Sequence, residues 1–188
     1  MTPTATIRLA EAPDFDAIAA INNHYIRDTA IHFGEADVPA EDMRKLWRQH
    51  FDLYPWIVSV AGDTIVGFAK SGEFRTRAAY RWTTEAGIYL VPGMHGRGLG
   101  KLLYGRLCGV LRAQGFHQVV GGITLPNAAS VRLHESLGFV HWGTVRRVGR
   151  KFGAWHDVGF WQLLLQPETH EPGALLPPAQ AFAAVTGG

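Results

Sequence analysis

The stretch GMHGRGLGKLL, residues 93–103, places three glycines at alternate positions beside basic residues. It directly follows the apolar run GIYLV (87–91), and apolar residues then recur at helical spacing from Leu99 to Leu111. This pattern predicts a strand that leads through a glycine loop into a helix. Glycines let backbone N–H groups turn toward one point, and the N-terminus of a helix attracts anions. The stretch therefore favours a pyrophosphate-binding loop, although its glycine content fits a plain turn equally well.

Two common nucleotide-binding motifs do not fit this loop. The Walker A pattern requires a glycine where this sequence has His95, and a serine or threonine where it has Leu102. The dinucleotide fingerprint G-x-G-x-x-G requires a third glycine, where this sequence has Lys101 or Leu103 according to the starting glycine. An ATP loop and a Rossmann fold are therefore disfavoured.

Hydrophobic periodicity along the chain predicts an α/β protein. We expect strands at 7–9, 56–61, 64–70, 81–91, 117–125, 140–149 and 155–165, and helices at 13–25, 40–53, 99–115 and 127–139. The Gly62-Asp63 turn makes the second and third strands an antiparallel hairpin. After Gln166 the sequence is dominated by Pro, Ala and Gly. The prediction is one domain over residues 1–166 and a C-terminal tail, 167–188, outside the fold.

The composition excludes several classes of function. A length of 188 residues with 47% hydrophobic and 18% charged residues is typical of one globular domain. The net charge of +2 and the lack of Lys/Arg runs argue against nucleic-acid binding. No apolar stretch is long enough for a membrane helix, and the N-terminus has no signal core, so we expect no membrane partner and a cytoplasmic location. The single cysteine, Cys108, is expected to fill the core.

The segment from His95 to Gly100 resembles the coenzyme A motif of the GNAT superfamily, (Gln/Arg)-x-x-Gly-x-(Gly/Ala), and departs from it at His95. The predicted order of strands and helices also matches that superfamily. Within it, the chain is similar to the phosphinothricin and methionine sulfoximine N-acetyltransferases over about residues 6–165. The similarity is carried by NHYI (23–26), YPW (54–56), RTRAAYRWTTE (75–85), LPNAASVRLHESLGF (125–139) and GAWHDVGFWQ (153–162).

This resemblance implies a fold, a reaction and a cofactor. The GNAT fold is a single α/β domain, with a mixed, mostly antiparallel sheet of six or seven strands flanked by about four helices. The reaction is direct transfer of the acetyl group of acetyl-CoA to the α-amino group of phosphinothricin, methionine sulfoximine or methionine sulfone, in a detoxification role. The resemblance also implies a homodimer, and neither it nor the scattered histidines implies a metal.

Two side chains are candidates for catalysis. The resemblance points to Glu85 as the general base, directly or through a water, while an exposed or salt-bridged glutamate is the alternative. It points to His134 as a general acid or a substrate-orienting residue, and a helix histidine bonded to backbone is the alternative. Gly87 in mid-strand predicts a bulge or a close backbone approach, with an oxyanion-binding N–H near Leu90.

The remaining candidates bind the two substrates. The expected cofactor-binding residues are Ile88, Tyr89, Leu90, His95, Gly96, Arg97, Gly98, Leu99, Gly100, Asn127 and Ser130. The expected substrate-binding residues are Arg75, Arg77, Tyr80 and Phe33, with His32 as a neighbour. Guanidinium groups suit the carboxylate and the phosphinate or sulfoximine oxygens of such an amino acid.

Two other functions stay open at this point. A GNAT enzyme for another small amine, an aminoglycoside or a polyamine, would need an acidic pocket, and the segment RTRAAYR (75–81) argues against one. A non-catalytic acetyl-CoA-binding module would not need both Glu85 and His134.

Overall fold

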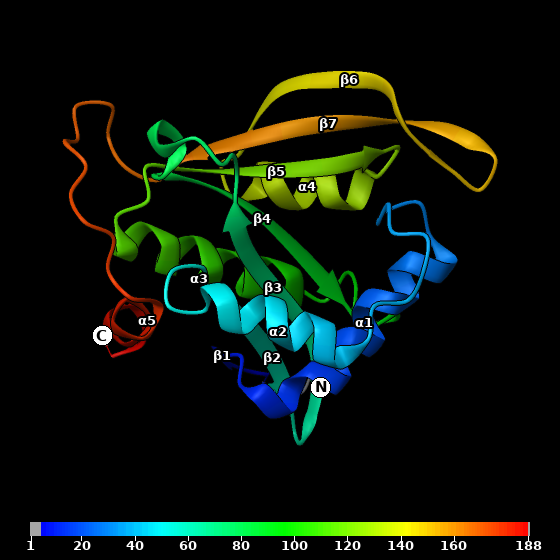
Figure 1. The fold of residues 1–188 in the computed structure, drawn as a ribbon, viewed down its shortest axis with the longest axis horizontal. Helices are drawn as coiled ribbons and strands as arrows, with labels where there is room; N and C mark the ends of the chain where they lie inside the picture. Colours follow the sequence, from blue (N-terminus) through cyan, green and yellow to red (C-terminus); the bar gives the residue numbers. More distant parts are fainter. Residues whose placement is uncertain (1–4, 188) are drawn as a thin grey trace.

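The computed structural model describes residues 5–187, so the domain limits predicted at residues 1 and 188 lie outside the described residues. Within that range the chain forms one sheet of seven strands and five α-helices, as the α/β prediction expected (Figure 1). The strands are β1 (Thr6–Leu9), β2 (Trp56–Ala61), β3 (Thr64–Glu73), β4 (Thr83–Leu90), β5 (Gln118–Leu125), β6 (Val140–Lys151) and β7 (Ala154–Leu164). The α-helices are α1 (Phe15–Asp28), α2 (Ala40–His50), α3 (Leu99–Gln114), α4 (Ala128–Ser136) and α5 (Pro178–Thr186).

The sheet has the order β1-β2-β3-β4-β5-β7-β6, and among the described strands only β4 and β5 run parallel. These two strands pair at three positions, from Thr83 opposite Gln118 to Glu85 opposite Val120. Beyond that point β4 stays paired with β3, and β5 stays paired with β7. The facing edges of β4 at 86–90 and of β5 at 121–125 therefore separate, as Figure 1 shows.

Each face of the sheet is covered by helices and buries its own apolar core. On one face, α1 and α2 pack over alternate strand residues that include Val58 and Phe68. On the other face, the neighbouring residues Ile57 and Ala69 pack with α3, whose Leu107 is fully buried. This alternation follows from the two-residue period of a strand and fixes which side chains reach each face.

The prediction that residues after Gln166 lie outside the fold is wrong for the part that the structure describes. Helix α5 packs beside α3 (Figure 1), and its Ala181 has no exposed surface. Arg106 on α3 donates to the carbonyl of Val185 (2.7 Å). The composition suggested a tail outside the fold, but enough apolar side chains lie on one face of this segment to cover α3. No helix among residues 5–187 is both long and apolar enough to span a membrane.

Candidate active site

The glycine loop lies between β4 and α3, as predicted. Gly93, Gly96 and Gly98 have φ values of 84°, 74° and 79°, a left-handed region that favours glycine. Gly100 was expected to belong to the same set, but it lies in the first turn of α3 and has no positive φ. The left-handed glycines are therefore at 93, 96 and 98, and Gly100 contributes close packing of the helix.

The loop presents backbone donors at the start of α3. The first bond of the helix runs from the Leu102 N–H to the Gly98 carbonyl (3.1 Å), so the N–H groups of residues 99–101 come before that bond. Arg97 and Lys101 are exposed beside them. Backbone donors, the helix dipole and two cations together suit a pyrophosphate.

The side chain of His95 is turned toward the protein. Its Nε2 lies 3.1 Å from the hydroxyl of Tyr25 on α1, and that hydroxyl donates to the Leu90 carbonyl at the end of β4 (2.7 Å). His95 therefore links the loop to α1 through Tyr25. The departure from the expected Gln or Arg leaves the backbone donors of the loop unaffected.

Every second residue of β4 directs its backbone N–H and C=O groups toward β5. Val91 donates through its N–H to Val66 on β3 (2.9 Å), and successive peptide groups along a strand point to opposite edges. The peptide groups of Ala86, Ile88 and Leu90 consequently point into the opening between β4 and β5. This places two of the predicted cofactor residues, Ile88 and Leu90, with their backbones at the opening.

Two tyrosines satisfy the carbonyls at the ends of this edge. The Tyr104 hydroxyl donates to the Ala86 carbonyl (3.2 Å), and the Tyr25 hydroxyl donates to the Leu90 carbonyl. The peptide group of Ile88 lies between them. An extended chain that carries amide groups fits such an edge, and the glycine loop fits a pyrophosphate, so the residues present suit coenzyme A.

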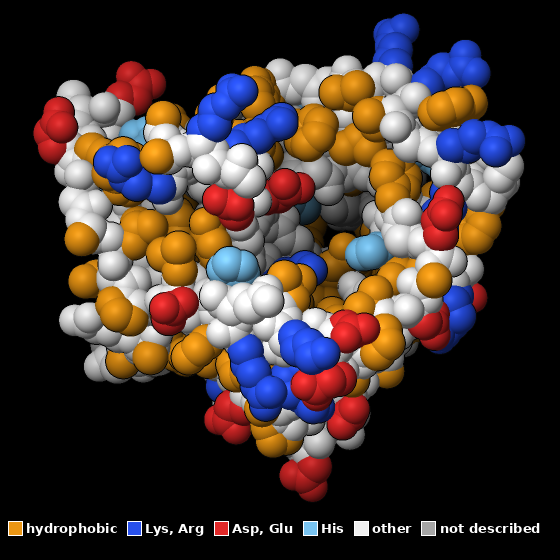
Figure 2. Space-filling view, in the orientation of Figure 1, with side chains coloured by type: hydrophobic (Ala, Val, Ile, Leu, Met, Phe, Trp, Pro, Cys, Tyr) orange, Lys and Arg blue, Asp and Glu red, His pale blue; other side chains and the backbone are white. Residues whose placement is uncertain are grey.

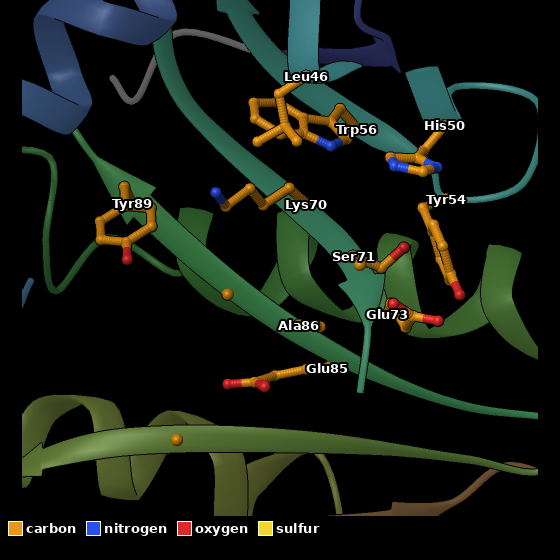
Figure 3. A pocket seen from close by; sticks show the side chains of 13 residues that line it. Leu46, His50, Tyr54, Trp56, Lys70, Ser71, Glu73, Glu85, Ala86 and Tyr89 are labelled. Carbon is orange, nitrogen blue, oxygen red and sulfur yellow. The ribbon is translucent and has the colours of Figure 1, made fainter. Parts of the chain in front are cut away.

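A cavity of about 490 Å³ lies on the α1 and α2 face of the sheet, next to this opening. Figure 2 shows a hollow in that face, and Figure 3 shows the side chains around the cavity. Its polar and aromatic lining side chains include Tyr54, Trp56, Lys70, Glu73, Glu85 and Tyr89. Burial raises the pKa of Tyr89 to about 12, so this phenol stays protonated at neutral pH.

Glu85 is the last residue of β4 that pairs with β5, and its side chain extends into this cavity. Its carboxylate is accessible to solvent, but the surrounding protein desolvates it in part and raises its pKa. The positive charges of Arg75 and Lys70 oppose this rise. A side chain at Gly122 on β5 would lie 3.7 Å from Glu85 Oε1. Among residues 5–187, Glu85 takes part in no salt bridge, so the salt-bridged alternative is wrong, whereas its exposure agrees with the exposed alternative.

The prediction of a bulge at Gly87 is also wrong. The register between β3 and β4 runs without interruption, and Gly87 lies opposite Lys70. Its missing side chain instead leaves open space above the strand, between Glu85 and Tyr89 on the same face. The glycine therefore helps to form the cavity.

His134 is buried beneath the point where β4 and β5 separate. Its Nδ1 lies 2.8 Å from the Ser130 carbonyl, and its ring packs against Tyr104 and Phe139 (4.9 Å between centroids in each case). A neutral ring that donates from Nδ1 leaves Nε2, which lies against Gly121, as an acceptor. Burial lowers the pKa of His134, and the Ser130 bond raises it. The backbone-bonded alternative therefore matches this geometry.

Asn127 caps the start of α4 by accepting a hydrogen bond from Ser130. The Asn127 side-chain oxygen accepts from the Ser130 N–H (3.1 Å), as expected of an N-cap. The predicted polar stripe of Asn127, Ser130 and His134 is thus a chain of bonds within the helix.

A second cavity of about 420 Å³ brings together Arg75, Arg77 and Tyr80, as the sequence predicted. It shares Tyr54 and Glu73 with the first cavity, so the two adjoin. The C-terminal segment at 173–175 lines its far side, where the Trp82 indole donates to the Gly173 carbonyl (2.9 Å). The arginines are exposed, and they lie at the Tyr54 end of the site.

Phe33 is not brought to either cavity. Its ring packs over Gly149 on β6, 6.2 Å from the ring of His156. The neighbouring His32 lies closer to the site, with its ring 6.0 Å from that of Tyr89. Burial lowers the pKa of His32, and the nearby ammonium groups of Lys70 and Lys151 lower it further.

Sequence reasoning missed Lys70, Trp56 and Tyr54. The signal for Lys70 was a charged residue at the end of the apolar run VGFA (66–69), because a lysine on a buried strand needs a polar environment. Trp56 and Tyr54 belong to the segment YPW (54–56), which carries part of the family similarity, but nothing in that segment pointed to a role in the site. No group of three His, Cys, Asp or Glu side chains suited to a metal occurs within the described part of the chain.

Comparison with known proteins agrees with this geometry. Residues 7–159 match the family model described as an acetyltransferase (GNAT) domain. The phosphinothricin N-acetyltransferase of Streptomyces viridochromogenes is 45% identical over 157 residues, which cover 83% of this chain and 85% of that protein. The L-methionine sulfoximine/L-methionine sulfone acetyltransferase of Salmonella typhimurium is 40% identical over 162 residues, 85% of this chain and 94% of that protein.

Solved structures include similar folds. A phosphinothricin acetyltransferase from Sinorhizobium meliloti, in complex with AcCoA, has a TM-score of 0.86 and 31% identity, and the match covers 95% of this chain and 98% of that one.

Proposed function

Because the chain belongs to the GNAT acetyltransferase family, we propose that it transfers the acetyl group of acetyl-CoA to the α-amino group of a small amino-acid analogue. The substrates proposed are phosphinothricin, methionine sulfoximine and methionine sulfone, after the names of its relatives. One observation supports the proposal above the others. The carboxylate of Glu85 stands where β4 and β5 separate, with cationic side chains on either side of it.

Acetyl-CoA would supply the activated acetyl group. The pyrophosphate would be held by the glycine loop and the first turn of α3, and the amide-bearing arm by the open edge of β4 around Ile88. The Leu90 N–H points into the same opening and is the proposed donor to the developing oxyanion.

Glu85 is the proposed general base. The substrate arrives as an ammonium ion, which must lose a proton before its nitrogen can attack. A partly desolvated carboxylate with a raised pKa accepts that proton more readily than an ordinary surface glutamate. Gly87 leaves space beside it for the substrate.

His134 is proposed to position the site rather than to donate a proton. Its Nδ1–H is committed to the Ser130 carbonyl, and its depressed pKa keeps the ring neutral. Together with Tyr104 it supports the backbone of β4 and β5 at the start of the opening. A leaving thiolate, with a pKa of about 8.5, needs only modest help from an acid.

A thiol-release assay with acetyl-CoA tests this proposal. The panel would contain phosphinothricin, methionine sulfoximine, methionine sulfone, spermidine and an aminoglycoside. We expect turnover of at least one of the three amino acids and little or none of the two amines. Efficient turnover of spermidine with none of the amino acids would contradict the proposal.

We also propose a homodimer, a cytoplasmic location and a detoxification role. Strand β6 lies at the edge of the sheet and exposes apolar side chains, a feature that marks interaction surfaces. These are Val140, Trp142, Val145 and Val148. Sedimentation equilibrium would test for the dimer, and cell fractionation would test the location. Growth on phosphinothricin of cells that express the protein would test the detoxification role.

A further inference from the structure

Lys70 lines the cavity of about 490 Å³ that also contains Glu85. It lies on β3 opposite Gly87, and on the other side of β3 it pairs with Trp56 of β2. Its ammonium lies 4.7 Å from the centre of the Trp56 ring. Figure 3 shows Lys70 and Glu85 extending into the same space, with the Lys70 ammonium directed toward Tyr89.

No carboxylate neutralises this ammonium within residues 5–187. Lys70 is absent from the salt bridges there, and its nearest acidic influence is Glu85, which acts at longer range. Burial lowers the pKa of Lys70, and Glu85 raises it. Lys70 is half-buried, and a cation with limited access to water is costly unless an anion accompanies it. The cation–π contact with Trp56 offsets part of this cost, but it supplies neither a negative charge nor a hydrogen-bond acceptor such as a carboxylate oxygen.

Cations thus stand at two separate places around Glu85. Arg75 and Arg77 line the cavity that adjoins the Tyr54 and Glu73 end of the site. Lys70 is directed toward the opposite end, at Tyr89. A substrate whose amino group lies at Glu85 can therefore place one anionic group at the arginines and a second at Lys70.

The spacing suits an amino acid with an acidic side chain. Gly87 and Glu85 are successive residues on one face of β4, roughly 7 Å apart along the strand. Lys70 lies across from Gly87, so its ammonium is displaced along the strand from the Glu85 carboxylate. In phosphinothricin, three carbon atoms separate the amino nitrogen from the phosphinate, which is a comparable displacement.

We infer that Lys70 binds the anionic side-chain group of the substrate, so that the enzyme prefers phosphinothricin to the uncharged analogues methionine sulfoximine and methionine sulfone. This inference rests on the proposed function and names the substrate class within it. Lys70 thereby determines specificity, whereas Glu85 acts on the amino group that all three analogues share.

Lys70→Met removes the charge and keeps most of the volume. With saturating acetyl-CoA at pH 8, we expect kcat/KM for phosphinothricin to fall about 10- to 100-fold, mainly through KM, because a charged hydrogen bond is lost. For methionine sulfone we expect kcat/KM to fall by less than about 3-fold, because its sulfone group carries no net charge that Lys70 would neutralise. Lys70→Arg should keep most of the preference, and Lys70→Gln should reproduce the loss with a polar side chain.

Lys45→Met is the matched control, because Lys45 is an exposed lysine on α2 and does not line the cavity. It should leave the ratio of the two kcat/KM values unchanged. Thermal melting identifies any variant that fails to fold, and either neutral variant suffices for the test.

Four outcomes overturn the inference. An equal fall for both substrates, or no fall for phosphinothricin, would show that Lys70 does not sense the side-chain charge. Wild-type turnover of methionine sulfone without turnover of phosphinothricin would overturn the inference and leave the proposed function standing. Failure of the wild-type enzyme on all three analogues would remove the proposed function, and this inference with it.

Discussion

Glu85 and Val120 form the last pair between β4 and β5, and the two strands separate directly after them. The candidate base is therefore fixed to the point where the opening begins. One end of Glu85 belongs to the paired part of the sheet, which holds its backbone, while its carboxylate extends into the cavity. A rigid backbone beneath a reactive side chain is what positioning of an incoming amine requires.

Glu85→Gln tests the base. Below its pKa the wild-type carboxyl is protonated and cannot accept a proton, so kcat/KM should fall as the pH drops through that raised pKa. In the variant, kcat/KM near neutral pH should fall about 10²- to 10⁴-fold. The decrease of kcat/KM toward low pH, which is the acid limb of the profile, should disappear. A pH–rate profile of both proteins from pH 5 to 9 measures the effect.

Glu73→Gln is the control for this substitution. Glu73 is a carboxylate in the same cavity, but at the end that adjoins the arginines. The variant should retain the acid limb of the wild-type profile. If instead Glu73→Gln removes that limb and Glu85→Gln keeps it, the assignment of the base is wrong.

Gly98→Ala tests the glycine loop. Gly98 has a φ of 79° at the N-cap of α3, so a side chain there strains the backbone that presents the N–H donors. We expect a loss of stability of about 1–2 kcal/mol. We also expect a rise of about 10-fold or more in the Kd for acetyl-CoA, equivalent to the loss of one or two hydrogen bonds.

Gly62→Ala separates strain from binding. Gly62 has a φ of 59° in the turn between β2 and β3, outside the loop. This variant should lose similar stability while keeping the wild-type Kd for acetyl-CoA, measured by calorimetry. Equal effects of both variants on that Kd would argue against the loop as the cofactor site.

The local part of this site could be predicted from the sequence. The strand, the left-handed glycines and the start of α3 are adjacent in the chain, so their spacing alone indicates a strand–loop–helix junction. The candidate base, just upstream of the loop, was instead identified through the family resemblance. Gly100 was grouped with the loop glycines by its spacing, although the helix predicted at 99–115 already contained it, as the structure confirms.

The register of Lys70 opposite Gly87 could not be predicted. It depends on how β3 and β4 align, and a shift of one residue would turn Lys70 to the other face of the sheet. For the same reason Gly87 was interpreted as a bulge rather than as open space. Phe33 was placed in the pocket by its position in the sequence, whereas its contact with Gly149 is long-range and depends on how β6 packs.

Acid should destabilise the protein partly through two histidines, the buried His134 and the half-buried His32. The pKa values of His134 and His32 are lower in the folded protein than the ordinary value of 6.5. Below about pH 6.5 the unfolded chain takes up protons that the folded protein does not, so the free energy of unfolding falls with falling pH until it reaches the folded pKa values. The slope is at most about 1.4 kcal/mol per pH unit for each histidine.

Urea denaturation between pH 8 and 5.5 measures this slope. His134→Gln should make the dependence on pH less steep, and the same change at the exposed His170 should not. An unchanged slope in His134→Gln would show that this ring is protonated equally in the folded and unfolded states.

The C-terminal helix should contribute to stability. Ala181 on α5 is fully buried, so Ala181→Asp places a charge without a partner in an apolar contact. We expect a loss of about 2–4 kcal/mol in the free energy of unfolding. Ala184→Asp, at an exposed position of the same helix, should cost less than about 0.5 kcal/mol. Equal effects would mean that α5 does not pack on α3 in solution.

The position of the acetyl group in the product tests the central claim most directly. The purified protein would be incubated with acetyl-CoA and phosphinothricin, and the product analysed by mass spectrometry and NMR. The account predicts one added acetyl group on the α-nitrogen, with release of one free thiol for each product molecule, and loss of this product in Glu85→Gln. Absence of acetylated product from phosphinothricin, methionine sulfoximine and methionine sulfone alike would contradict it.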